Sequence, residues 1–177
     1  MSEKEFAAVL FHELVKVLGE GNVKCDENLL YKIMVDETGA VKPDNIEKPK
    51  RGQLAFTTDL LIMDKKLPAV VIEVKYNGFS THDVLTYSTK ALKHKEVYPY
   101  LRYGMVIGNT HVVTNKFFTH NVGFDFGIAL KDTSEESIKE FISLIKSQVK
   151  ASQALKKVLR EKNTTRLFNS KLEIKHV

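Results

Sequence analysis

Two short runs of sequence, Thr58-Asp59-Leu60-Leu61-Ile62 and Ile72-Glu73-Val74-Lys75, decide the fold that we expect for this chain. Both runs are apolar and rich in β-branched residues, and a short segment with a proline separates them, which predicts a β-hairpin. Because alternate side chains of a strand share a face, Glu73 and Lys75 point to the same side. The hairpin can therefore bring Asp59 beside Glu73, with Lys75 one step away.

These three charges lie where the sheet is expected to be buried. Val70, Val71 and Ile72 lead directly into Glu73, which predicts a strand that is covered on both faces. An isolated carboxylate is costly to keep ionised there, but a divalent cation would neutralise Asp59 and Glu73 together. The backbone carbonyl of Val74 adds a third oxygen ligand for an ion such as magnesium.

Lys75 has two expected roles beside such an ion. It could orient or deprotonate an attacking water, or stabilise negative charge that develops on a phosphate. The alternative to a metal site is an internal ion pair between Lys75 and one of the two acids.

Outward from the hairpin, the sequence alternates predicted helices and strands. Helices are predicted where a serine can cap the first turn, over residues 3–18, from Ser80 to about Glu96, and from Ser134 to about Arg160. Strands are expected at least once within 23–35, at 53–64 and 69–76 in the hairpin, at 102–108, and once or twice within 115–130. The helix after Ser80 makes the strands on either side of it parallel neighbours. Residues 38–52 are expected to form a surface loop.

This order of elements and charges resembles the PD-(D/E)xK nuclease superfamily, the restriction-endonuclease-like proteins. Their signature is an Asp in one strand and Glu-x-Lys on the neighbouring strand, which Asp59, Glu73 and Lys75 match in order and setting. The resemblance covers about residues 3–110, and Thr58 stands in place of the proline of the motif. It implies an α/β fold: a mixed β-sheet flanked by helices, with an αβββαβ core and a C-terminal helix.

The domain organisation that we expect is a single nuclease domain over residues 1–177. Its core covers about 3–130, and a basic C-terminal helix and tail cover about 134–177.

The resemblance implies a magnesium-dependent endodeoxyribonuclease, with manganese able to replace magnesium. Asp59, Glu73 and the carbonyl of Val74 would hold the ion, and Lys75 would assist the attacking water. We expect a type II restriction endonuclease that acts on DNA as a homodimer, because cutting two strands calls for two sites. Three alternatives stay open: a Holliday-junction resolvase or repair nuclease, a non-catalytic DNA-binding or assembly subunit of a restriction system, and the nuclease domain of a larger type I restriction subunit.

Both predicted helices that flank the hairpin carry further candidates. Glu13 falls within the apolar arc of the first helix, so it lies inward or at the rim. In several groups of the superfamily a glutamate on this helix reaches the metal, so Glu13 is a further expected catalytic residue, with a rim acid paired to a base as the alternative. On the second helix, Asp83 and Tyr87 share a face, but the glutamine of the RecB-type Gln-x-x-x-Tyr motif is missing.

The positive charge is concentrated at the end of the chain. The net charge is +5, and residues 146–177 hold nine bases and two acids. Such asymmetry favours an attachment surface for a polyanion such as nucleic acid, with a solvated helix face as the alternative. The expected DNA contacts come from the loop before Asp59 and from the second and last helices; they are Lys50, Arg51, Lys90, Lys93, Lys150 and Lys157.

Several classes are excluded by what the sequence lacks. No phosphate-binding GxxxxGK[ST] or Gly-rich dinucleotide turn occurs, so we expect no nucleotide cofactor. No apolar run approaches the roughly 18 residues of a membrane helix. The first residues do not resemble a secretory signal, so a cytoplasmic location is expected.

Overall fold

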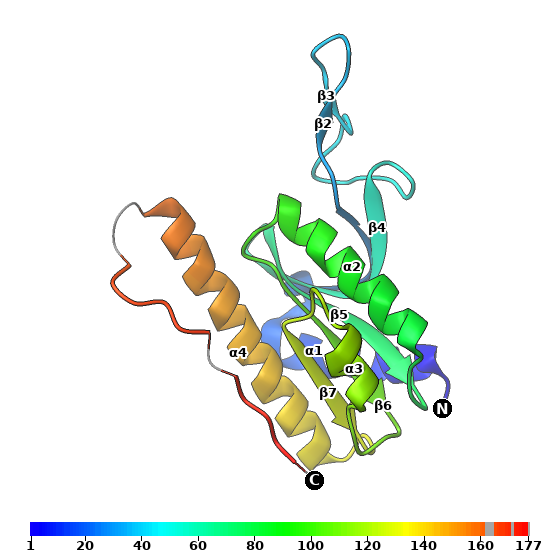
Figure 1. Ribbon diagram of the computed structural model, residues 1–177. Coiled ribbons are helices and arrows are strands. Elements are labelled where there is room, and N and C mark those ends of the chain that lie inside the picture. Colours follow the sequence, from blue (N-terminus) through cyan, green and yellow to red (C-terminus); the bar gives the residue numbers. More distant parts are fainter. Residues whose placement is uncertain (162–164, 171, 177) are drawn as a thin grey trace.

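The centre of the fold is a five-stranded mixed β-sheet with the strand order β1-β4-β5-β6-β7 (Figure 1). The computed structural model describes residues 1–161, 165–170 and 172–176. The strands of this sheet are β1 (Val23–Leu30), β4 (Ala55–Asp64), β5 (Leu67–Tyr76), β6 (Arg102–Gly108) and β7 (Phe126–Leu130). The pairs β1–β4 and β4–β5 are antiparallel, whereas the pairs β5–β6 and β6–β7 are parallel. The predicted hairpin, the parallel pair and the α/β class are confirmed.

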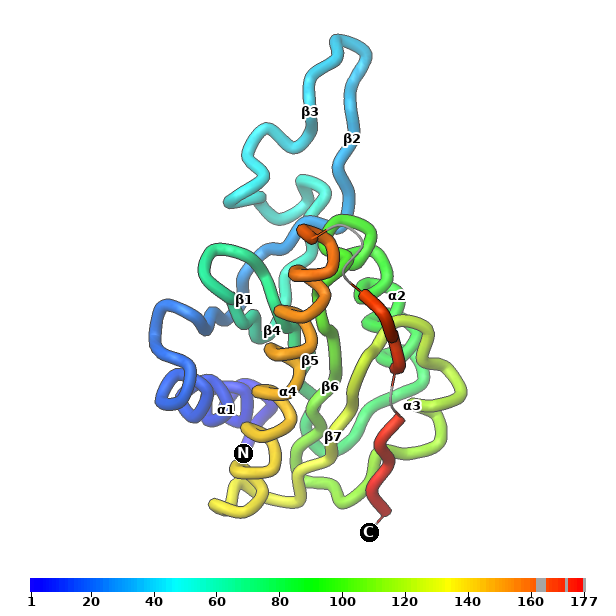
Figure 2. Tube along the Cα trace, turned by 90° about the vertical axis from the view of Figure 1, so that its left-hand side faces the viewer, coloured from blue at the N-terminus to red at the C-terminus, as the bar shows by residue number. Residues whose placement is uncertain are grey.

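Helices cover both faces of this sheet. Figure 2 shows α1 (Glu3–Leu18) and α4 (Glu135–Arg160) on one side, and α2 (Thr81–Val97) and α3 (Asn115–His120) on the other. A short 3-10 turn, η1 (Glu20–Asn22), leads from α1 into β1. No helix among the described residues is long and apolar enough to cross a membrane.

The long helices begin where the sequence predicts them. Ser2 and Glu5 form a capping box at α1, and Ser80 and Asp83 form a second one at α2. The hydroxyl of Ser134 caps α4 by accepting a backbone N–H bond from the first turn. Each cap satisfies N–H groups that have no partner within the helix, so the start of each helix is set locally.

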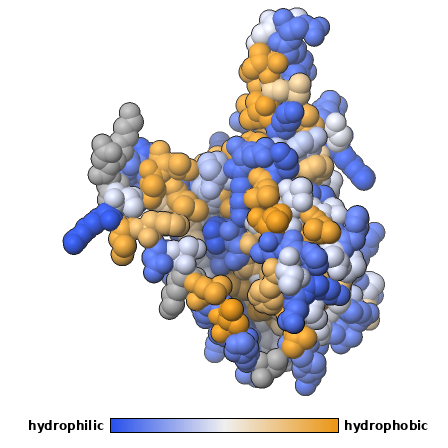
Figure 3. All heavy atoms as spheres, viewed as in Figure 1, coloured by the Kyte–Doolittle hydropathy of each residue, from blue (hydrophilic) through white to orange (hydrophobic). Residues whose placement is uncertain are grey.

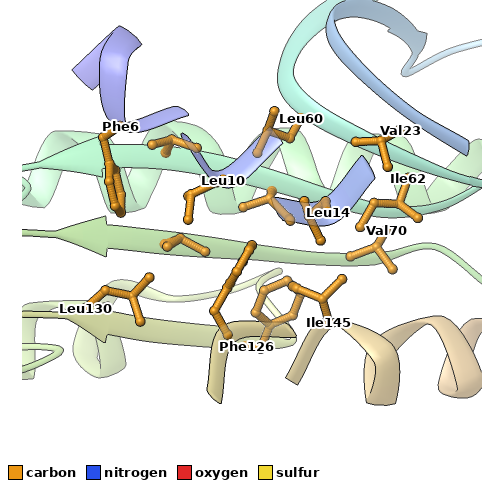
Figure 4. Packing of buried hydrophobic residues seen from close by; sticks show 14 of the residues in the cluster. Phe6, Leu10, Leu14, Val23, Leu60, Ile62, Val70, Phe126, Leu130 and Ile145 are labelled. Carbon is orange, nitrogen blue, oxygen red and sulfur yellow. The ribbon is translucent and has the colours of Figure 1, made fainter. Parts of the chain in front are cut away.

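Two apolar cores, one on each face of the sheet, hold the helices in place. The core on the first face joins α1 and α4 to the sheet through Phe6, Leu10, Leu14, Phe141 and Ile145 (Figure 4). The core on the second face joins α2 and α3 to the sheet through Val71, Val84, Ala91, Met105 and Phe117. Strand β5 contributes to both cores, which confirms that it is covered on both sides. Full burial of each large apolar side chain stabilises the fold by about 1.5–3 kcal/mol.

Two segments differ from the prediction. Within 115–130, a six-residue helix, α3, precedes the single strand β7. Phe117 is buried in the second core, whereas the next residue, Phe118, is 56% exposed. The segment therefore buries one ring and continues as a helical turn.

The predicted loop at 38–52 contains part of a protruding arm. This arm, residues 33–42, is formed by β2 (Met34–Val35) and β3 (Val41–Lys42), which pair in antiparallel fashion. Figure 1 shows the arm extending from the body, and Figure 3 shows apolar side chains on its surface. Its exposed apolar residues are Ile33, Met34, Val35 and Val41.

The basic C-terminal segment is described only in part. Lys150 and Lys157 belong to α4 and are exposed. Lys162 and Lys171, which were counted among the nine bases, lie outside the described residues.

Candidate active site

Asp59 on β4 and Glu73 on β5 lie next to each other within the sheet. The antiparallel register pairs Leu60 with Ile72, so the next position along the hairpin brings Asp59 to Glu73. The Oδ2 atom of Asp59 accepts a 2.7 Å hydrogen bond from the backbone N–H of Val74. This bond fixes the Asp59 carboxylate at the β5 strand, beside Glu73.

Glu73 is a buried acid with one hydroxyl partner. Its exposed fraction is 1%, and the hydroxyl of Tyr103 on β6 donates a hydrogen bond to its Oε1 atom. Burial, followed by the charge of Asp59, raises the pKa of Glu73 to about 8. Because the Asp59 and Glu73 carboxylates lie close together and Glu73 is buried, the pair favours binding either a proton or a cation between them.

Lys75 lies one step further along β5, where α1 and α2 approach the strand. Its ammonium is 3.4 Å from the Glu3 carboxylate, 3.9 Å from that of Asp83, and 5.0 Å from the ring centre of Tyr87. Burial lowers the pKa of Lys75, but Tyr87, Glu3 and Asp83 together outweigh it and hold this pKa above its usual value. Lys75 is therefore an ammonium at neutral pH, suited to stabilising negative charge rather than to removing a proton from water.

The two lysines of α2 that were predicted to contact DNA, Lys90 and Lys93, point in different directions. The Lys90 ammonium lies 4.7 Å from the ring centre of Tyr87 and 5.5 Å from that of Phe56, and its charge lowers the pKa of Glu73. Lys93 is exposed and forms a 2.8 Å ion pair with Glu96. The two were predicted to act alike, but Lys90 faces the site and Lys93 faces solvent.

Glu13 is not brought to these residues. It forms a 2.6 Å ion pair with Lys16, which is the alternative that the sequence left open. Along α1 it lies about 15 Å from Glu3, at 1.5 Å per residue. Glu3, in the first turn of α1, is the acid that reaches Lys75 instead.

Two further residues of the site, Glu3 and Tyr103, were missed by the sequence reasoning. Neither carries a local signal, because the partner of each lies on another element: Lys75 for Glu3, and Glu73 for Tyr103. Burial and the neighbouring Glu73 raise the pKa of Tyr103 well above its usual value, so its hydroxyl keeps the proton that it donates.

The donor set at Asp59 and Glu73 fits a magnesium ion that keeps part of its water shell. Magnesium in proteins is commonly held by one or two carboxylates, with water and substrate oxygens as the other ligands. Among the described residues, no group of three or more His, Cys, Asp and Glu side chains comes together. The Val74 carbonyl, water and substrate would therefore complete the coordination.

The other residues predicted to bind DNA fall on two separate surfaces. Arg51 and Lys90 line an open groove near the start of β4, and Lys50 is exposed beside it. Lys150 and Lys157 belong to α4, which covers the face of the sheet opposite to α2 (Figure 2).

Comparisons with protein-family models and with curated protein sequences identify no match. The chemistry of the site is read from its geometry: two adjacent carboxylates, one of them buried, an ammonium beside them, and a groove lined by two basic side chains nearby.

Proposed function

We propose that this chain is a magnesium-dependent endodeoxyribonuclease with a restriction-endonuclease-like fold, of the type II restriction enzyme kind. The observation that carries the proposal is the position of Asp59 and Glu73 on adjacent strands, with the Lys75 ammonium one step further along β5. The succession α1, β1, β4, β5, α2 and β6 agrees with the αβββαβ core of that superfamily. The homodimer that the sequence analysis expects belongs to the same proposal.

The residues of the chain would act mainly by holding charge in place. Bound magnesium supplies a Lewis acid that neutralises a phosphate and lowers the pKa of a coordinated water. The Val74 N–H orients Asp59, and the Tyr103 hydroxyl orients Glu73, so both carboxylates are positioned before the ion arrives. The Lys75 ammonium would stabilise the negative charge that builds up on the phosphate during in-line attack.

The decisive experiment is cleavage of several DNA forms by the purified protein, with magnesium or with a chelator. Supercoiled plasmid, methylated genomic DNA and a four-way junction distinguish a restriction enzyme, which gives discrete fragments, from a resolvase. We expect Asp59→Ala, Glu73→Ala and Lys75→Ala each to lower the magnesium-dependent rate by about 100-fold or more.

The matched control is Glu136→Gln, an exposed acid in the first turn of α4. It should cleave like the parent, and circular dichroism should show that all four variants are folded. Cleavage at the parent rate by any one of the three site variants would contradict the assignment of these residues to a nuclease site.

A further inference from the structure

Two lysines and three aromatic rings form one path that leads away from the candidate active site. The Lys75 ammonium lies 5.0 Å from the Tyr87 ring centre, and Lys90 bridges the rings of Tyr87 and Phe56 at 4.7 and 5.5 Å. Tyr31 stacks on Phe56, with ring centres 4.0 Å apart and planes 14° from parallel. We call these five side chains the cation–aromatic row.

The row ends in the open groove near the start of β4. The groove has a volume of about 310 Å³, and its larger side chains are Tyr31, Arg51, Phe56 and Lys90. This volume lies at the lower end of the roughly 300–1,000 Å³ that is common for small-molecule sites. Gly52, Ala55 and Thr57 complete the wall, so no bulky side chain fills the space. The groove is therefore large enough for one planar ring system.

The two bases of the groove have no acidic partner within the described residues. Neither Arg51 nor Lys90 comes within ion-pair distance of a carboxylate there, whereas Lys93, one turn from Lys90, pairs with Glu96. Tyr31, Phe56 and Lys90 are all only partly buried. A ligand that supplies both negative charge and a flat aromatic face would satisfy this surface, and a nucleotide has both.

We propose that the cation–aromatic row and its groove hold an unpaired segment of a DNA strand. A base would stack on Tyr31, and the phosphates would contact Arg51 and Lys90. Stacking platforms joined to a positive groove are the usual means of binding single strands. In a paired duplex the faces of the bases are covered by their neighbours, so a base must leave the stack to reach Tyr31.

The substrate class follows from the position of the row. The row meets the candidate active site at Lys75, so the unpaired segment would lie next to the phosphate that is cut; this part rests on the proposed nuclease function. Forks, flaps, gaps and duplexes with an extruded base present such a segment. Within the proposed nuclease, the groove thus favours DNA that presents an unpaired base near the cut, including a duplex site with an extruded base, over DNA in which every base stays paired.

The test is DNA binding by the full chain in the presence of a chelator, measured by fluorescence anisotropy. The probes are a blunt duplex, the same duplex with a single-stranded extension, and the extension alone. We expect Tyr31→Ala to weaken binding of the two probes with unpaired bases by about tenfold, and to change blunt-duplex binding by less than about twofold. Tyr31→Phe keeps the ring and should bind like the parent.

Two further variants keep the test decisive. Arg51 is exposed, so Arg51→Ala should fold normally and flatten the salt dependence for the single strand by roughly 0.7 in slope. Phe118→Ala removes an exposed ring on α3, away from the groove, and should leave all affinities unchanged. Unchanged binding of the unpaired probes by Tyr31→Ala and Arg51→Ala, or an equal loss for the blunt duplex, would overturn the proposal.

The outcome is separable from that of the nuclease assignment, because binding is measured without cleavage. If binding depends on Tyr31 but the protein cuts no DNA with magnesium, the proposed DNA-binding groove is supported and the proposed nuclease function is contradicted. If the protein cuts DNA with magnesium but neither Tyr31 nor Arg51 affects binding, the nuclease function is supported and the proposed DNA-binding groove is contradicted.

Discussion

Two glutamates of α1 differ in what their carboxylates contact. Glu3 lies 3.4 Å from the Lys75 ammonium, whereas Glu13 is paired with Lys16. We expect Glu3→Gln to lower the magnesium-dependent cleavage rate by up to about fivefold, because a partly exposed ion pair that positions Lys75 is worth at most about 1 kcal/mol. Glu13→Gln should leave both the rate and the magnesium titration unchanged. A shifted titration for Glu13→Gln alone would restore Glu13 to the site.

His94 makes the stability of the fold depend on pH. It is fully buried, its ring stacks at 5.7 Å on that of Tyr103, and its Nδ1 atom lies 2.9 Å from the carbonyl oxygen of Leu30. Burial lowers the pKa of His94 from 6.5 to about 4. Below pH 6.5, His94 therefore binds a proton in the unfolded chain but stays neutral in the folded chain.

The contribution of His94 to stability is therefore complete above about pH 6.5 and should be lost as the pH drops toward 4, by on the order of 3 kcal/mol. Urea denaturation at several pH values measures the slope, and His94→Gln should flatten it. His82→Gln, at an exposed position on α2, is the control and should keep the parent slope. An equal slope in all three proteins would show that His94 is not responsible.

At the scale of elements, Gly123 lies in the segment that connects α3 to β7, where this segment packs closely against α2. A Cβ atom at this position would lie 2.2 Å from the carbonyl oxygen of Ser88 and 2.9 Å from the backbone nitrogen of Leu92. Because these are backbone atoms of a helix, they cannot turn aside, so Gly123→Ala should lower the free energy of unfolding by about 1–3 kcal/mol. Urea denaturation measures the loss.

Gly21 provides the comparison, since no heavy atom lies within 4 Å of the Cβ that it would gain and its backbone is not left-handed. Gly21→Ala should change stability by less than about 0.5 kcal/mol. Equal stability of the two variants would mean that the Gly123 connection can move away from α2.

The elements that the sequence predicted are those with local signals at their ends. Helices α1, α2 and α4 each follow a capping serine, and the β4–β5 hairpin has a two-residue turn between two apolar runs. Helix α3 was missed because it is six residues long and its first turn has no side-chain cap. A helix this short is stabilised by tertiary packing, here of Phe117, which local periodicity does not report.

The residues of the candidate site also divide into those that local sequence signals could predict and those that they could not. Asp59, Glu73 and Lys75 could be placed together because one hairpin carries all three. Glu3 and Tyr103 join them from α1 and β6, so their positions depend on how separate elements pack. Helical periodicity indicated that α1 carries an acid of the site, but it could not show that the first turn of α1, with Glu3, approaches Lys75, whereas Glu13 lies further along the helix.

At the scale of the whole molecule, the basic end of α4 lies across the sheet from the candidate site. Lys150 and Lys157 are exposed, whereas Lys156 is held by a 2.8 Å ion pair with Asp64 and is left out of the test. We expect the double variant Lys150→Glu, Lys157→Glu to weaken duplex binding and to lower the slope of log K against log salt by roughly 1.8, at about 0.9 for each phosphate contact.

Cleavage at low salt should persist in this variant, because neither lysine approaches Asp59 or Glu73. Reversing Lys4 and Lys139, which are also exposed, gives the same change of net charge as a control. If both double variants lower the slope equally, only the total charge matters and α4 is a solvated helix.

The central position of β5 has a consequence for how the protein moves. This strand has β4 on one side and β6 on the other, with an apolar core on each face. We therefore expect its amide hydrogens to exchange with deuterium only when the whole sheet opens. The arm is a two-stranded ribbon with exposed apolar residues and should exchange by local opening, far faster. Glu73 and Lys75 thus belong to the slowest-exchanging part of the molecule. If DNA binds as proposed, we expect any adaptation to it to come from the arm and from the segment 43–54 that follows it, while the acids stay in place.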